Sequence, residues 1–261
     1  MRNDQLSDVD FGLIGYPLGH SFSKFFFTEK FAREGKNLKY ENFELPKLDP
    51  AALYSLVLLN PNLKGFNVTA PYKEAVMEYL DKIEGVAAVV GAVNTVKVVR
   101  DDTGRVLRLE GYNTDVEGFR ESLRPLVEGL EGSGALVLGT GGASKAAVEG
   151  LRQLGLKPMR VSRSRKEADT LLYTELTPEV MASHPVVVNT TPLGTFPDTD
   201  SCPQLPFDLL PADAVCFDMV YNPEETEFMR RAADKGAKTK NGLEMLHRQA
   251  LASFAIWQTQ D

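Results

Sequence analysis

The sequence predicts an α/β protein with two domains, the second of which contains a doubly wound parallel sheet. Three observations support this prediction. Short apolar runs alternate with segments of helical pattern along the chain. The runs in the second half are continuously apolar, which is typical of parallel strands covered on both faces. The length of 261 residues corresponds to slightly fewer than two domains of about 150 residues each.

The first half begins with a short apolar run, residues 11–15, which ends in turn residues and therefore predicts a buried strand. A helix over residues 24–34 is expected next, and Ser23 would suit its N-cap. The apolar face of that helix is expected to consist of Phe25, Phe26, Phe27 and Phe31.

The remaining elements of the first half follow from pattern and proline placement. Residues 39–45 alternate enough for a strand, 49–59 favour a helix and 65–69 favour another strand. Pro71 is expected to open a helix over 72–81, because proline is tolerated in a first helical turn. Residues 95–110 have the pattern of a hairpin around the turn Asp-Asp-Thr-Gly.

The second half predicts βαβ units. Helices are expected over 115–130, 143–154 and 242–257, and strands over 135–138, 159–163, 185–190 and 214–220. Candidate core residues of the last helix are Leu243, Leu246, Leu251, Phe254 and Trp257. We expect residues 1–110 to form one domain and 111–239 the other, with the C-terminal helix, 240–261, folding back on the first domain.

Composition excludes several classes of function. The net charge of −7 argues against a general affinity for nucleic acid or anionic membranes. Two cysteines, Cys202 and Cys216, cannot build a disulfide scaffold or a four-ligand zinc site, and both are expected to be buried, reduced thiols. With three histidines, no metal site is expected. The polar start and short apolar runs predict a soluble protein in a reducing compartment such as the cytoplasm.

A glycine-rich turn, Gly139 to Ser144, lies between a predicted strand and a predicted helix, which is the setting of a dinucleotide-binding loop. Gly139 would allow the tight turn, and Gly141 and Gly142 would let the backbone approach a pyrophosphate at the helix N-terminus. Ser144 replaces the third glycine of the usual fingerprint. The alternative is a loop that only permits close packing of strand and helix.

The end of the next strand indicates which dinucleotide is bound. An NAD site usually has an acidic residue there, but this chain has Ser162, Arg163 and Arg165, with no acid until Glu167. A carboxylate would repel a 2′-phosphate, whereas arginine binds it through charge-assisted hydrogen bonds. The sequence therefore predicts NADP, the alternative being that the arginines lie in a solvated loop.

Polar residues of the first half suggest acid–base chemistry. Lys73 is expected in the first turn of a helix. The helix dipole disfavours the protonated lysine there, which suits a side chain that transfers a proton. The alternative is that Lys73 is an ordinary exposed lysine. Asp115 could pair with Lys73 across a cleft. It could equally be a first-turn acid, since Thr114 and Glu117 fit a capping box.

These motifs together resemble the shikimate dehydrogenase family over nearly the whole chain. Nine matching motifs occur in the family's order: Gly15–Ser23, Asn67–Lys73, Gly91–Thr95, Asn113–Asp115, Gly139–Ser144, Arg163, Asn189–Gly194, Asp218–Pro223 and Gly242–Ala250. The resemblance implies an N-terminal substrate domain, a Rossmann-like NADP-binding domain and a cleft between them. Two positions depart from the family pattern, Lys24 in place of proline and Thr195 in place of methionine.

The resemblance also implies an activity, the NADP-dependent interconversion of 3-dehydroshikimate and shikimate by a monomer or homodimer. The catalytic pair would be Lys73 and Asp115. The substrate-binding residues would be Ser21, Ser23, Thr69, Asn94, Asp115, Tyr221 and Gln249. The cofactor-binding residues would be Gly139, Thr140, Gly141, Gly142, Ala143, Ser144, Ser162, Arg163, Arg165, Thr190 and Gly242.

Three alternatives remain beside this interpretation. A quinate/shikimate dehydrogenase of broader specificity would carry the same motifs. A non-catalytic NADP-binding regulatory module would be expected to lose Lys73 or Asp115, and both are present. A related two-domain dehydrogenase acting on a folate is disfavoured by the paired serines and by Gln249.

Overall fold

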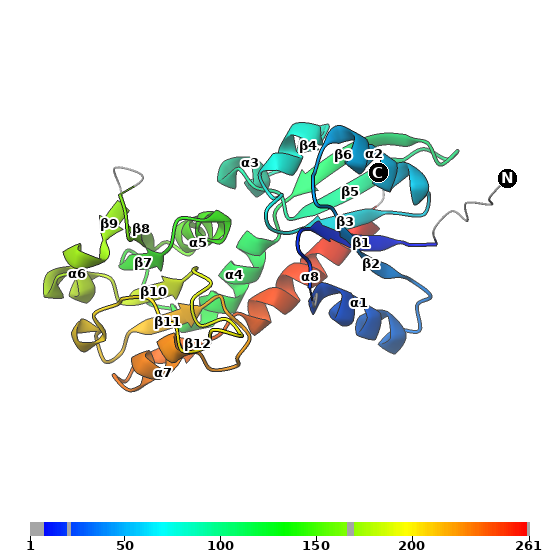
Figure 1. The fold of residues 1–261 in the computed structure, drawn as a ribbon. Helices are drawn as coiled ribbons and strands as arrows, with labels where there is room; N and C mark the ends of the chain where they lie inside the picture. Colours follow the sequence, from blue (N-terminus) through cyan, green and yellow to red (C-terminus); the bar gives the residue numbers. More distant parts are fainter. Residues whose placement is uncertain (1–7, 20–21, 166–169, 260–261) are drawn as a thin grey trace. The chain divides into compact units, whose positions relative to one another are not determined.

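The computed structural model describes residues 8–19, 22–165 and 170–259 and contains two six-stranded sheets (Figure 1). The chain divides into two units, Met1–Thr114 together with Ala250–Asp261, and Asp115–Gln249. Each unit is described by itself. Within the described ranges, no helix is long and apolar enough to cross a membrane.

The first unit is built on a mixed sheet with the strand order β2-β1-β3-β5-β6-β4. Strand β1 pairs in parallel with β2 and β3, whereas β3, β5 and β6 are antiparallel neighbours. The strand bounds are β1 Phe11–Gly15, β2 Tyr40–Glu44, β3 Gly65–Val68, β4 Lys82–Ile83, β5 Thr95–Arg100 and β6 Val106–Tyr112. The predicted hairpin is confirmed by β5 and β6.

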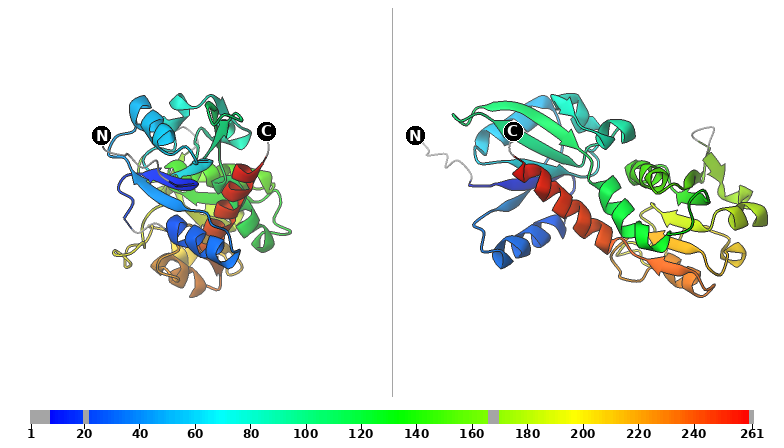
Figure 2. Two further views of the ribbon diagram at one scale, coloured as in Figure 1. Left: turned by 90° about the vertical axis from the view of Figure 1, so that its right-hand side faces the viewer. Right: turned by 180° about the vertical axis from the view of Figure 1, so that it is seen from behind.

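Two hydrophobic clusters cover the two faces of this sheet. One contains Ile14, Phe66 and Val96, with side chains from α2 (Pro50–Leu59) and α3 (Val86–Val90). The other contains Phe11 and rings from α1 (Phe22–Arg33) and the C-terminal helix α8 (Leu243–Gln258). Figure 2 shows α1 and the red C-terminal helix on the same side of the sheet. The last turns of α8 are therefore part of the core of the first unit.

The second unit is built on an all-parallel sheet with the order β12-β11-β10-β7-β8-β9. This is the strand order of the doubly wound dinucleotide-binding fold, so the predicted fold class is confirmed. The strand bounds are β7 Gly134–Leu138, β8 Lys157–Ser162, β9 Thr170–Leu172, β10 Val186–Asn189, β11 Val215–Asp218 and β12 Lys238–Lys240. The helix bounds are α4 Asp115–Leu123, α5 Gly142–Gln153, α6 Pro178–Ser183 and α7 Glu227–Ala233.

Both faces of this second sheet are buried. Alternate residues of β7 point to opposite sides, so that Ala135 and Val137 join one cluster and Leu136 and Leu138 the other. Helices α4 and α5 contribute to the first cluster and α6 and α7 to the second. Burial on both faces is the physical reason for the continuously apolar strands of the sequence.

The helix expected over residues 72–81 is wrong. A short 3-10 helix, η1 (Ala75–Tyr79), forms instead, and Lys73 lies in the loop before it. The carbonyl of Lys73 accepts a hydrogen bond from the Val93 N–H at 2.7 Å. A distant segment of the same chain therefore occupies a carbonyl that would accept a hydrogen bond within the expected helix. The argument that a helix dipole acts on Lys73 therefore has no structural basis.

Other expectations about helix ends are also corrected. Helix α1 begins at Phe22, so Ser23 lies inside the helix and is not its N-cap. Helix α4 ends at Leu123, and a 3-10 helix, η2 (Arg124–Leu126), follows it. The Thr114 hydroxyl interacts with Asn94, Thr95 and Ser253, so the capping box with Glu117 does not form.

Some expected core residues are exposed. Phe25 is 66% exposed, Leu251 46% and Leu243 37%, whereas Phe27, Phe31, Phe254 and Trp257 are buried as expected. Helix α8 buries Met245, Ala250 and Ser253 instead. Both cysteines are free, but Cys202 is only half-buried while Cys216 is fully buried.

Candidate functional site

The glycine-rich turn lies at the point where the strand order of the parallel sheet reverses. Strand β7 has β8 on one side and β10 on the other, and the loop from β7 enters α5 directly. Ligands of doubly wound sheets bind at this position, outside the carboxyl ends of the strands. Gly139 has φ +115°, and a Cβ there would lie 2.8 Å from the Thr190 Oγ1 atom. Glycine is therefore required at 139 by both the turn and the neighbouring loop.

The start of α5 has the features of an anion cradle. A Cβ built on Gly141 or Gly142 would meet no atom within 4 Å, so this backbone faces open space. The helix N-terminus has no side-chain cap. The buried Ser144 Oγ has no hydrogen-bond partner in the described part of the chain. The uncapped start of the helix beside open space fits a bound pyrophosphate, and the Ser144 hydroxyl lies buried in the same first turn.

The arginines expected to recognise a 2′-phosphate follow β8 and are exposed. Arg165 forms an ion pair with Glu175 at 2.5 Å. Arg163 makes no ion pair with any residue of the described ranges. Burial raises the pKa of the Tyr173 hydroxyl to about 12, and the positive charge of Arg163 opposes this rise. Ser162 is the last residue of β8. Of the two arginines, Arg163 is the one whose guanidinium pairs with no carboxylate among the described residues.

The loops after β10 and β11 are joined by buried polar side chains. Asn189 Nδ2 donates to Asp218 Oδ1 at 2.9 Å, and the Thr190 hydroxyl donates to the Leu138 carbonyl at 2.7 Å. Gly242 donates its N–H to the Val220 carbonyl, and a Cβ there would lie 2.3 Å from the Met219 carbonyl oxygen. The loop after β11 therefore packs on Gly242 in a way that only glycine allows.

The first unit contains a buried network of hydroxyl and amide groups. Thr114 donates its N–H to Asn94 Oδ1 at 2.8 Å, and the hydroxyls of Thr95 and Ser253 lie 2.7 Å apart. Asn67 Nδ2 donates to the Ser253 hydroxyl at 2.9 Å. The network holds Asn94 and Thr114 in place, and Asp115 is the residue that follows Thr114 in the chain.

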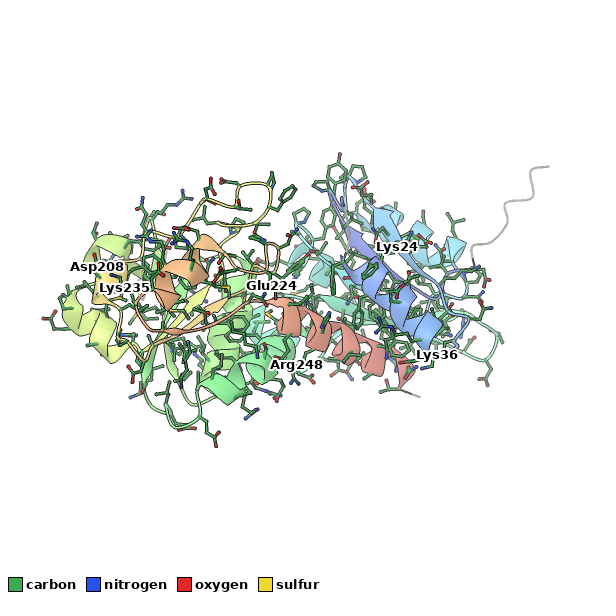
Figure 3. The ribbon with its side chains drawn as sticks, turned by 90° about the horizontal axis from the view of Figure 1, so that it is seen from below. Lys24, Lys36, Asp208, Glu224, Lys235 and Arg248 are labelled. Atoms are coloured by element: carbon green, nitrogen blue, oxygen red, sulfur yellow. The ribbon has the colours of Figure 1, made fainter. Side chains whose placement is uncertain are left out.

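The network continues to the start of α1. The Tyr40 hydroxyl donates to Asn67 Oδ1 at 2.9 Å. Burial raises the pKa of Tyr40, and a hydrogen bond with Ser23 opposes the rise. Ser21 lies outside the described residues. The unusual Lys24 forms an ion pair with Glu41 at 2.5 Å, so its charge is compensated (Figure 3 labels this residue).

The other predicted site residues follow strands or helix ends. Thr69 follows β3 and donates its N–H to the Ile14 carbonyl at 2.9 Å. Lys73 is partly buried and belongs to the first unit, while Asp115 is buried and opens α4 of the second unit. Gln249 lies on α8, and Tyr221, which follows β11, is 38% exposed. Partial burial raises the pKa of the Tyr221 hydroxyl. The pairing of Lys73 with Asp115 stays a prediction.

Sequence reasoning assigned no role to several residues of these networks. Asn67, Thr95, Asn189 and Asp218 lie in the matching motifs but were not site candidates, and Ser253 lies outside the motifs. One signal was available for Ser253, since it interrupts the apolar face formed by Ala250, Phe254 and Trp257. The described residues contain no group of three or more His, Cys, Asp or Glu side chains placed to hold a metal ion.

The strand order and the loop at its reversal point define the class, an α/β protein with a dinucleotide-binding domain. Residues 13–96 match the family model of the shikimate dehydrogenase substrate-binding domain. Because a relative with this activity in its name is 36% identical over 94% of the chain, the chain belongs to the shikimate dehydrogenase family.

Relatives that are similar over nearly the whole chain agree with this family. The NADP(+) shikimate dehydrogenase of Carboxydothermus hydrogenoformans is 36% identical, over 94% of this chain and 90% of the relative. The Thermus thermophilus shikimate 5-dehydrogenase structure, in complex with NADP(H) and shikimate, is 33% identical with TM-score 0.80 and coverages of 96% and 93%. A quinate dehydrogenase from Corynebacterium glutamicum in complex with NAD is 26% identical with TM-score 0.84 and coverages of 96% and 94%.

Proposed function

We propose that the chain is an NADP-dependent shikimate dehydrogenase, which reversibly reduces 3-dehydroshikimate to shikimate in aromatic amino-acid biosynthesis. The observation that carries the proposal is the open, uncapped helix start at Gly141 and Gly142, in the same turn as the buried Ser144 hydroxyl. The relatives support the substrate, because the C. hydrogenoformans protein is named for this activity and the T. thermophilus structure contains both ligands.

The cofactor is assigned to residues at the carboxyl ends of the parallel strands. Residues 139–144, including Thr140 and Ala143, would hold the pyrophosphate at the N-terminus of α5. Arg163 would bind the 2′-phosphate, with Ser162 and Arg165 beside it. Thr190 and Gly242 would contact the remainder of the dinucleotide.

The substrate is assigned mainly to the first unit. Ser21 and Ser23 would bind the carboxylate. The ring hydroxyls would be bound by Thr69, Asn94, Asp115 and Gln249, and Tyr221 would line the site. Support comes from the hydrogen bonds that hold Asn94 and Ser23 in one connected network of the first unit.

NADPH, when bound, supplies the hydride that reduces the C3 ketone. Lys73 Nζ donates a proton to the oxygen at C3, and in the reverse direction the same nitrogen accepts the proton. Asp115 would be the partner carboxylate of Lys73 and would also bind the neighbouring hydroxyl. General acid–base catalysis of this kind contributes roughly 10²–10⁴-fold, and alignment of the two reactants contributes further.

One spectrophotometric assay tests the proposal. NADP and NAD are each combined with shikimate and with quinate, and the absorbance of the reduced cofactor is followed. We expect the highest kcat/KM for NADP with shikimate. A rate at the level of the uncatalysed mixture in all four combinations would refute the proposed activity.

A quinate/shikimate dehydrogenase is the second candidate, favoured by the structural similarity to the C. glutamicum quinate dehydrogenase. It predicts comparable kcat/KM for the two substrates in the same assay. We further propose a cytoplasmic enzyme that is a monomer or a homodimer, a choice that light scattering of the purified chain decides.

A further inference from the structure

Asp218, the last residue of β11, is a fully buried carboxylate that accepts three hydrogen bonds. Its Oδ1 atom accepts from Asn189 Nδ2 at 2.9 Å and from the Val220 N–H at 3.0 Å. Its Oδ2 atom accepts from the Thr226 hydroxyl at 2.6 Å. No lysine, arginine or histidine of the described residues forms an ion pair with it. Neutral donors alone therefore hold this carboxylate.

Each donor belongs to a different segment of the second unit. Asn189 ends β10, and its Oδ1 atom accepts from the N–H of Thr191 at 3.0 Å and from the Thr191 hydroxyl at 2.7 Å. Val220 lies in the loop after β11, next to Tyr221. Thr226 caps α7, because its Oγ1 accepts from the Met229 N–H. One carboxylate thus ties together the loop after β10, the loop after β11 and the start of α7.

We propose that Asp218 is a positioning residue for the dehydrogenase reaction, whose ionised carboxylate holds the loops after β10 and β11 in their active arrangement. The inference rests on the proposed function, because that function assigns Thr190 to the cofactor and Tyr221 to the substrate. Asp218 acts through these loops and is itself sealed from solvent.

Most charged and titratable groups of the elements around Asp218 have other partners or are thiols, and Lys238, the exposed first residue of β12, lies opposite Val215 at the other end of β11. Burial raises the pKa of Cys216, on the same strand, to about 12 and that of Cys202 to about 11. The remaining groups are charged: Lys240 on β12, which contacts Glu244 and the Ser122 carbonyl, Arg230 on α7, which contacts Glu227 and Asp234, and Arg231 on α7, which lies over Phe207. Burial raises the pKa of Asp218 itself to about 6.

Protonation of Asp218 would change the network without breaking the fold. A proton on Oδ2 would donate to Thr226 Oγ1, which reverses that hydrogen bond. The two hydrogen bonds to Oδ1 would lose their charge assistance and become weaker. The loops that hold Thr190 and Tyr221 would therefore loosen as the pH falls through about 6.

Asp218→Asn mimics the protonated state in shape and charge. We expect kcat/KM for NADP with shikimate to fall on the order of 10- to 100-fold at pH 7.5, as for misplaced reactants. We expect an acid limb near pH 6 in the wild type, which the variant should lack, and the Tm of the variant should not be lower. The matched control is Asp208→Asn, at an exposed carboxylate of the same unit that pairs with Lys235 (Figure 3).

A second pair of variants keeps the test decisive if Asp218→Asn does not fold. Thr226→Val removes the donor to Oδ2, so the acid limb should move to higher pH, whereas Thr226→Ser keeps the donor and should restore the wild-type profile. If the wild type is active and its kinetics and acid limb are unchanged in Asp218→Asn, or in Thr226→Val, the inference is overturned and the proposed function stands. A wild type that is inactive with every cofactor and substrate removes the proposed function and this inference with it.

Discussion

Gly65→Ala is expected to destabilise the first unit by displacing the side chain of Trp257. Gly65 begins β3, and a Cβ there would lie 2.2 Å from Trp257 Cδ1, 2.3 Å from Trp257 Nε1 and 2.5 Å from the Val96 carbonyl oxygen. The Trp257 Nε1 atom donates to that same carbonyl at 2.9 Å, and the indole stacks on Phe11 with centroids 4.7 Å apart. An added methyl group therefore forces the indole away from both partners.

The expected loss of stability is about 2 kcal/mol. Overpacking a well-filled core costs about 1–3 kcal/mol, and loss of a buried hydrogen bond costs about 1 kcal/mol. Replacing glycine with alanine also restricts the unfolded chain, which offsets about 0.4–1 kcal/mol of this loss. The net value is well above the effect of an ordinary surface substitution, about ±0.5 kcal/mol.

Urea unfolding followed by tryptophan fluorescence measures this effect, because Trp257 is the single tryptophan of the chain. We expect a lower midpoint for Gly65→Ala and an altered native emission, since the indole changes its surroundings. The control is Gly142→Ala, where a Cβ meets no atom within 4 Å. A wild-type midpoint together with wild-type emission for Gly65→Ala would refute the reasoning.

Three further predictions concern the proposed site. Lys73→Ala should lower kcat at least 100-fold while leaving the Kd for NADP within twofold, measured by steady-state kinetics and calorimetry; a near-normal kcat would end the catalytic assignment. Arg163→Ala should raise the KM for NADP about tenfold and leave the KM for NAD unchanged, because Arg163 has no carboxylate partner among the described residues. Arg165→Ala should have a smaller effect, since Arg165 pairs with Glu175. Equal effects of the two variants on the KM for NADP would contradict this prediction. Asp218→Asn should raise the free energy of unfolding at pH 8, by at most about 3 kcal/mol, and have no such effect at pH 3. The sign follows because burial raises the folded-state pKa from 3.8 to about 6, so the ionised group destabilises the fold above that range and stability returns as the pH falls through it. Urea unfolding at both pH values checks this, and a lower stability of the variant at pH 8 would contradict it.

The longer strands were predictable because their signals are local, whereas the short strands β4, β9 and β12 were not predicted. Continuously apolar runs such as that of β7 result from burial on both faces, and the alternating hairpin of β5 and β6 has a turn with Gly104 at φ +84°. The glycine turn was predictable for the same reason, since the positive φ of Gly139 is a requirement of the local turn.

The errors arose where a distant segment decides the outcome. The helix expected at 72–81 fails because the Val93 N–H engages the Lys73 carbonyl. The role proposed for Asp218 depends on its hydrogen bond with Asn189, which is 29 residues away in the sequence and lies beside Asp218 only in the folded sheet. Ser253 bonds to Asn67 across 186 residues, a relation that no local pattern contains.

Helix α8 has a consequence for the order in which the protein matures on the ribosome. The second unit is one continuous stretch, Asp115–Gln249, but the first unit also needs Ala250–Asp261. Phe254 and Trp257, which complete the core around Phe11, are synthesised only after the whole second unit. The first unit must therefore wait for helix α8, and until then its aromatic cluster is exposed on the nascent chain and prone to aggregation.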